Sequence, residues 1–158
     1  MTSDVRGSHS LAPRSAARLA AVQALYQMDL AGTDIVDVIA QFNGLRFGER
    51  GEEPAIQDAD RVFFADVLKG VVRRQREIDP MVDQQLAEGW RLTRIDSILR
   101  AILRAGTLEL IERPDVPTRV VITEYVNVAH SFFEGDEPRV VNGVLDKLAR
   151  RLRPSDFA

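Results

Sequence analysis

Cysteine is absent from the 158-residue chain, which removes several kinds of chemistry at once. Without thiols the protein forms no disulfide, no thiolate metal site and no cysteine nucleophile. Long apolar runs are also absent, since none approaches the roughly 20 residues of a membrane span. Residues 1–13 lack the apolar centre of a secretory signal. We therefore expect a cytoplasmic protein that is not bound to a membrane.

Catalytic motifs are missing as well. The sequence contains no phosphate-binding loop, no nucleophile elbow, no Gly-x-Gly-x-x-Gly and no His-Glu-x-x-His. Its two histidines, His9 and His130, lie far apart, whereas a zinc site needs three or four convergent ligands. A chain of this length buries enough surface for one domain without a cofactor. We expect that the protein is not an enzyme and that it binds neither a metal nor a cofactor.

Lysine is scarce: 19 of the 21 basic residues are arginine, and the net charge is -3. That charge argues against a uniformly basic nucleic-acid binder. Guanidinium groups suit planar partners such as phosphates and bases. The simpler explanation, a genome rich in G and C, receives more weight. The positions of the arginines are therefore more informative than their number.

The spacing of apolar residues predicts an all-α, single-domain bundle. Residues 1–13 form an arm, 14–153 the helical domain and 154–158 a short tail. Seven helices are expected, beginning near Arg14, Asp34, Asp60, Asp79, Thr93, Thr118 and Asp136.

Two of these segments need an argument. Asp79 and Pro80 are suited to the N-cap and first position of a separate short helix that ends near Gly89. The β-branched residues within 118–126 favour a strand by propensity. However, Val121, Tyr125, Val128, Ala129 and Phe132 recur at helical spacing, so a helix is predicted there.

The last predicted helix carries the sequence Val-Asn-Gly-Val-Leu-Asp from Val141 to Asp146. Its apolar residues share one face, which places Asp146 and Arg153 outside. Gly143 lies in the interior of this helix, where glycine costs about 1 kcal/mol relative to alanine. We infer that another backbone or a partner approaches closely at Gly143.

Together with 18–26 near the start and Asp115-Val116-Pro117, this segment resembles the NusB family of bacterial transcription antitermination factors. The resemblance covers roughly residues 14–153. It implies a non-catalytic adaptor that binds the ribosomal protein NusE and, with it, single-stranded boxA RNA of ribosomal RNA leaders. RNA polymerase and other Nus factors would complete the antitermination complex.

Candidate RNA-binding residues lie at the start of the chain. Arg14 and Arg18 share a helix face at i and i+4 and are expected to point to solvent, and Arg6 extends the patch. The alternative is an ordinary solvated helix start. The resemblance implies that this arginine-rich start contacts RNA, although Ser15 and Ala16 replace further arginines. Tyr26 could stack on a base or fill the core.

Candidate partner-binding residues lie around 132–140. Phe132 and Phe133 precede an acidic turn that contains Glu134 and Asp136, a combination that suits protein docking. The alternative is a core Phe132 followed by a helix cap. The resemblance implies that this turn and the next helix bind NusE, with Asp136 as an acidic contact and Val140 in place of an aromatic.

Trp90 sits at a helix junction, where a core plug is favoured over a base-stacking ring. Two other functions stay open, the first of them implied by the resemblance. One is an accessory domain of an RNA methyltransferase, which would need a longer chain. The other is a self-associating helical protein, such as a homodimer.

Overall fold

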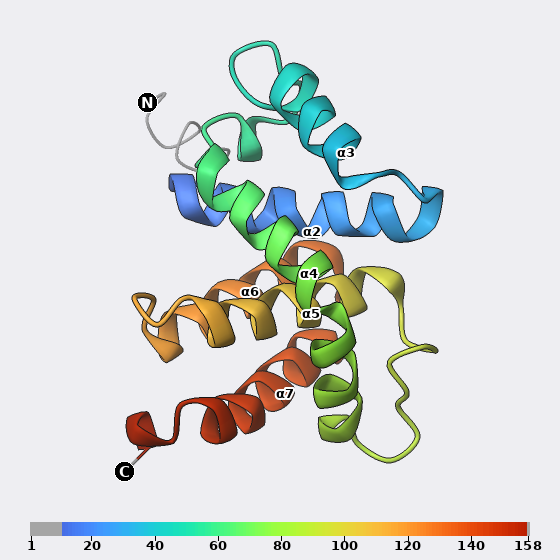
Figure 1. Cartoon of the computed structure of the whole chain (residues 1–158), viewed down its shortest axis with the longest axis vertical. Coiled ribbons are helices and arrows are strands. Elements are labelled where there is room, and N and C mark those ends of the chain that lie inside the picture. The colour runs from blue at the N-terminus through green and yellow to red at the C-terminus, as the bar shows by residue number, and fades with distance from the viewer. Residues whose placement is uncertain (1–10, 158) are drawn as a thin grey trace. The chain divides into compact units, whose positions relative to one another are not determined.

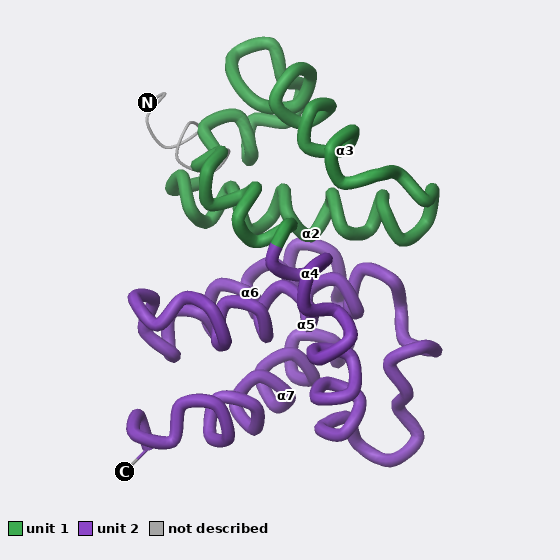
Figure 2. Tube along the Cα trace, viewed as in Figure 1, with its two compact units in different colours: residues 1–69 green, residues 70–158 purple. Residues whose placement is uncertain are grey.

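The computed structural model describes residues 11–157, so the predicted Arg6 and His9 lie outside the described part. Every regular element in 11–157 is helical, which confirms the all-α prediction (Figure 1). The contacts group the chain into two compact units, residues 1–69 and 70–158 (Figure 2). Each unit is described by itself.

The first unit contains α2 (Pro13–Ala31), α3 (Ile35–Gln41), two short irregular helices and the start of α4 (Arg61–Gln85). The short helices are η1 (Phe42–Arg46) and η2 (Pro54–Ile56). α2 ends at Gly32, whose φ of 68° is the left-handed conformation that glycine adopts without strain. Asp34 caps α3 by accepting a hydrogen bond from the Val36 N–H at 3.0 Å.

Three phenylalanine rings form an aromatic cluster in this unit. Phe42, Phe47 and Phe64 are all buried, and their ring centroids are 4.9 to 5.7 Å apart. Such spacing allows tilted and edge-to-face packing, which contributes beyond the area buried.

The second unit contains the rest of α4, α5 (Ser97–Glu112), α6 (Thr118–Phe132), α7 (Glu137–Leu152) and η3 (Pro154–Phe157). The helix predicted over 118–132 is therefore confirmed. α5 and α7 approach closely at Gly106, where an added Cβ would lie 2.8 Å from Leu145 Cδ1. Tyr125 and Glu109 are fully buried, and the Tyr125 hydroxyl donates a hydrogen bond to the Glu109 carboxylate.

α4 continues through Pro80, so the prediction of a separate helix beginning at Asp79 is wrong. A proline inside a helix costs about 3 kcal/mol in isolation. Tertiary contacts offset that cost here. Arg104 donates two hydrogen bonds to Asp79 at 2.8 and 2.9 Å, and Ile78 and Val82 are fully buried on either side of the proline.

The helical pattern predicted that Arg153 lies on the outer face of its helix, and this prediction is wrong. Its guanidinium donates to the backbone carbonyls of Glu109, Leu110 and Arg113 at 2.8 to 3.1 Å. It also donates to the Val116 carbonyl at 2.7 Å and to the Thr118 hydroxyl at 3.2 Å. Arg153 thus adds donors to carbonyls at and just after the end of α5, where helix carbonyls run short of partners.

Within residues 11–157 no helix is both long and apolar enough to cross a bilayer. The same part of the chain holds no group of three or more side chains suited to binding a metal ion.

Candidate RNA and partner interfaces

The start of α2 holds the two candidate arginines against one aromatic ring. The guanidinium carbon of Arg14 lies 4.8 Å from the Phe63 ring centroid, and that of Arg18 lies 4.9 Å from the same centroid. Both distances fall within the range of cation–π attraction. Phe63 itself is positioned by Asp60, whose carboxylate accepts a hydrogen bond from the Phe63 N–H at 3.0 Å.

The two arginines differ sharply in exposure. Arg14 is exposed, but Arg18 is only 3% exposed, so the prediction that both point to solvent is wrong for Arg18. Its neighbours Ala17, Ala20 and Ala21 are fully buried, and the alanine-rich helix sits deep enough to enclose it. Arg14 can therefore meet a phosphate directly, whereas Arg18 is placed to support Phe63.

Arg61 is a neighbouring cation that the sequence pattern did not single out. The Asp60 N–H donates to the Pro13 carbonyl at 2.9 Å and so joins the start of α4 to the start of α2. Arg61 is exposed, and its guanidinium carbon lies 5.7 Å from the Phe47 centroid. The contact between the two helix starts joins segments far apart in sequence, and no spacing in the sequence signals it.

Tyr26 lies two turns beyond Arg18 in α2 and is half-buried. Its ring is thus partly available to solvent, as a base-stacking residue requires. The base-stacking role of Tyr26 stays a prediction.

The turn between α6 and α7 presents the predicted partner residues in the second unit. Phe132 is 36% exposed, Phe133 is half-buried, and Glu134 and Asp136 are exposed. The Asp136 carboxylate makes no capping hydrogen bond with α7. Its backbone carbonyl instead accepts from the Arg139 and Val140 N–H groups, both at 3.0 Å. The acidic side chain is therefore available for a contact outside the chain.

Val140 lies one turn into α7 and lines a shallow groove of about 130 Å³. The other lining residues are Gln85, Ala87, Trp90, Gly143, Val144 and Lys147. A Cβ added to Gly143 would meet no atom within 4 Å in residues 11–157, so the close backbone contact expected there is not found in the described part of the chain.

Trp90 is 36% exposed on the same groove, so the prediction that it plugs the core is wrong. It follows Gly89, whose φ of 92° turns the chain after α4. Tryptophan is enriched among residues that dominate binding at protein interfaces. Sequence reasoning missed the exposed position of Trp90 because the groove forms only when α7 packs beside this turn.

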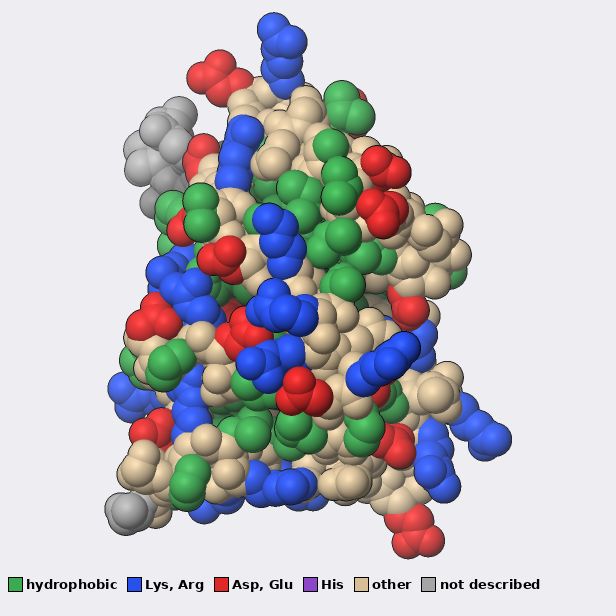
Figure 3. Space-filling model, viewed as in Figure 1, with side chains coloured by type: hydrophobic (Ala, Val, Ile, Leu, Met, Phe, Trp, Pro, Cys, Tyr) green, Lys and Arg blue, Asp and Glu red, His purple; other side chains and the backbone are tan. Residues whose placement is uncertain are grey.

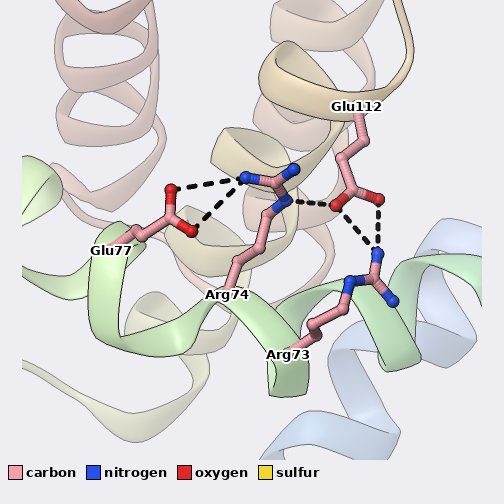
Figure 4. Close-up of polar contacts among 4 residues, drawn as sticks. All are labelled: Arg73, Arg74, Glu77 and Glu112. Carbon is pink, nitrogen blue, oxygen red and sulfur yellow. Dashed lines mark hydrogen bonds and ion pairs between the residues drawn. The ribbon is translucent and has the colours of Figure 1, made fainter.

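A network of ion pairs joins α4 to α5 in the second unit (Figure 4). Arg73 donates to both Glu112 oxygens at 2.8 Å, and Arg74 Nε donates to one of them. Burial raises the pKa of Glu112, but the hydrogen bonds from Arg73 and Arg74 outweigh it, and the pKa is lowered from its ordinary value. The hydrogen bond to Glu112 raises the pKa of Arg74.

On the face in Figure 3, acidic and basic side chains are interspersed rather than gathered by sign.

The comparisons with known proteins identify the family. The NusB family model matches residues 15–150. The chain belongs to the NusB family. A transcription antitermination protein NusB of Rhodopseudomonas palustris (strain TIE-1) is 51% identical over 153 residues, which cover 97% of this chain and 88% of that relative. One from Bartonella henselae is 52% identical over 153 residues and covers 95% of this chain and 97% of the relative.

Solved structures agree with this family assignment. The structure of T. maritima NusB matches with a TM-score of 0.73 and 26% identity, and the match covers 92% of this chain and 97% of that one. The solution structure of NusB from Aquifex aeolicus matches with a TM-score of 0.62 and 25% identity, and it covers 94% of each chain. The resemblance stated from the sequence motifs is confirmed.

Proposed function

We propose that this chain is a transcription antitermination factor that acts without catalysis. With the ribosomal protein NusE it binds boxA RNA of ribosomal RNA leaders and joins RNA polymerase and other Nus factors. Membership of a family whose curated relatives are named antitermination proteins is the observation that carries the proposal. The antitermination role follows from that membership, and the RNA contact and the NusE contact are assigned to separate residues.

The RNA contact centres on Arg14. Its exposed guanidinium is held over the Phe63 ring, which restricts its motion before RNA arrives. A preoriented side chain loses less conformational entropy on binding. Arg18 supports the same ring from a buried position.

The NusE contact centres on the turn of Phe132, Phe133, Glu134 and Asp136, and it continues into the groove of Val140 and Trp90. An exposed carboxylate beside apolar side chains attracts a basic ribosomal protein and then buries apolar surface. In support, the Asp136 side chain forms no cap hydrogen bond, and a Cβ at Gly143 would meet no atom within 4 Å in the described residues.

The experiment that tests the partner surface is charge reversal at Asp136. Asp136→Arg should weaken NusE binding by about 1 to 3 kcal/mol because a complementary charge becomes a repulsive one. The melting temperature should hardly change, since the carboxylate holds no backbone group. Calorimetric titration with NusE measures the loss.

Glu52→Arg is the matched control, because Glu52 is an exposed acid in the other unit. It should leave NusE binding unchanged. Equal losses in both variants would mean that only net charge matters. Unchanged binding of Asp136→Arg would place the docking surface elsewhere.

A further inference from the structure

A second cavity lies in the unit formed by residues 70–157, outside both surfaces described above. Its volume is about 440 Å³, within the range of small-ligand sites. Residues from the start of α6, from α7 and from η3 border it. Its lining residues are Thr118, Arg119, Ile122, Thr123, Asn142, Asp146, Asp156 and Phe157.

The wall that η3 contributes is held in place by defined contacts. The Thr118 hydroxyl donates to Asp156 Oδ2 at 2.6 Å and accepts a hydrogen bond from Arg153 at 3.2 Å. The Arg150 guanidinium carbon lies 4.5 Å from the Phe157 ring centroid. η3 is therefore fastened to both helices rather than resting beside them.

Several polar groups of this cavity have no partner in the described part of the chain. Neither Arg119 nor Asn142 forms an ion pair or a side-chain hydrogen bond within residues 11–157, and both are exposed. A guanidinium binds phosphate, and an amide can both donate to and accept from a base edge. The two groups offer the two kinds of contact that a nucleotide needs.

Phe157 supplies an aromatic surface at the same place. Its ring is 36% exposed and lines the cavity, and the Arg150 guanidinium over the same ring leaves the other face for a base. Phenylalanine rings and guanidinium planes are the usual platforms on which unstacked bases rest. Two carboxylates also line the cavity: Asp146 accepts a hydrogen bond from Arg150 at 3.2 Å, and Asp156 accepts one from the Thr118 hydroxyl at 2.6 Å.

We propose that this cavity takes one unpaired nucleotide of single-stranded RNA, with the base against Phe157, its edge at Asn142 and its phosphate at Arg119. The inference rests on the proposed function, because it gives the bound RNA a second contact. Double-stranded RNA does not fit this arrangement, since paired bases keep their edges and faces inside the helix. The cavity therefore favours RNA whose bases are unstacked.

The test is the affinity of the full chain with NusE for labelled boxA RNA, measured by fluorescence anisotropy at several salt concentrations. Phe157→Ala should weaken binding by about 5-fold or more with little change in the salt dependence, because stacking is lost and no charge is removed. Arg119→Ala should reduce the salt slope by roughly 0.7, the value for one phosphate contact to a single strand. Asn142→Ala should weaken binding without changing the slope.

Arg76→Ala is the control for Arg119→Ala. Arg76 is likewise an exposed helical arginine with no ion pair or hydrogen bond within residues 11–157. It should bind RNA as the unmodified chain does. Circular dichroism melting of each variant separates a lost contact from a lost fold.

The outcomes are distinct. If Arg14→Ala weakens RNA binding while Phe157→Ala, Asn142→Ala and Arg119→Ala all match the unmodified chain, the cavity holds no nucleotide and the proposed function stands. If the unmodified chain with NusE binds no boxA RNA, the proposed function and the cavity inference both fail. If Arg76→Ala lowers the slope as much as Arg119→Ala, the effect is one of net charge and the inference is overturned.

Discussion

Arginine is used differently in the two units of the molecule. In residues 11–69 four guanidinium groups lie over three phenylalanine rings: Arg14 and Arg18 over Phe63, Arg46 over Phe42 and Arg61 over Phe47. In residues 70–157 the arginines are mostly held by oxygen atoms. Arg104 binds the Asp79 carboxylate, Arg73 and Arg74 bind Glu112, and Arg153 binds backbone carbonyls. Arg46 does both, since it also pairs with Glu53 at 3.1 Å.

The contrast separates cations that hold the fold from cations that can serve a ligand. A guanidinium over a ring keeps its N–H donors at the rim of the ring, where a phosphate can reach them if the side chain is exposed. A guanidinium that satisfies carbonyls has already used its donors. The number of arginines therefore does not indicate RNA binding in this chain. The surroundings of each arginine indicate whether it can bind RNA.

The largest effect is expected from Arg153 in the second unit. Arg153→Lys should lower the free energy of unfolding by about 2 to 4 kcal/mol, because a single ammonium cannot reach all the oxygens that the guanidinium bonds and leaves the Leu110 or Val116 carbonyl without its donor. Urea denaturation followed by circular dichroism measures it. A loss below about 0.5 kcal/mol would show that the carbonyls find other donors.

A smaller loss is expected at Arg18 in the first unit. Arg18→Met keeps apolar volume over Phe63 but removes the buried cation–π contact, which should cost about 1 to 2 kcal/mol of stability. Thermal melting provides the measurement. If stability is unchanged while RNA binding is lost, Arg18 contacts RNA directly and the contrast with Arg14 breaks.

The ion pairs of Glu112 should contribute no more than about 1 kcal/mol to the free energy of unfolding, since Arg73 is largely exposed. The pKa of Glu112 is lowered in the folded state, so its stabilisation is fully present above the ordinary carboxyl pKa. That stabilisation is lost as the pH falls through the lowered value. Glu112→Gln should therefore be less stable than the unmodified chain at neutral pH, and the two should converge at low pH. A difference that does not change with pH would refute the charge-based explanation.

Arg14→Ala should have the smallest effect on the fold, with a change of unfolding free energy within about 0.5 kcal/mol, because the side chain is exposed. Its effect should appear in RNA binding instead, as a salt slope reduced by roughly 0.7 when NusE is present. Arg50→Ala, at another exposed arginine of the same unit, serves as the control and should leave the slope unchanged.

Local patterns in the sequence predicted most of the helices but few of the long-range contacts. The helix over 118–132 follows from spacing alone, because Val121, Tyr125 and Val128 must share one face. The continuation of α4 through Pro80 depends on Arg104, which lies 25 residues beyond Asp79. The contact of Arg18 with Phe63 likewise joins residues that are distant in the sequence.

The candidate partner site also has one part that the sequence predicts and one part that it does not. The acidic turn at Asp136 is continuous in sequence and could be recognised there. The groove that joins Trp90 to Val140 could not, because its two sides come from segments about 50 residues apart that meet only in the folded unit. Family resemblance supplied the roles, while the surroundings of each side chain decide which residues can perform them.

The affinity of boxA RNA for the chain, measured with and without NusE, tests the central claim most directly. Two partial surfaces joined in one complex should bind RNA much more tightly than either alone, by about 100-fold or more where both engage the same strand. The account predicts weak binding by the isolated chain and that large gain on adding NusE, with part of the gain lost in Arg14→Ala. The same affinity with and without NusE would contradict the account.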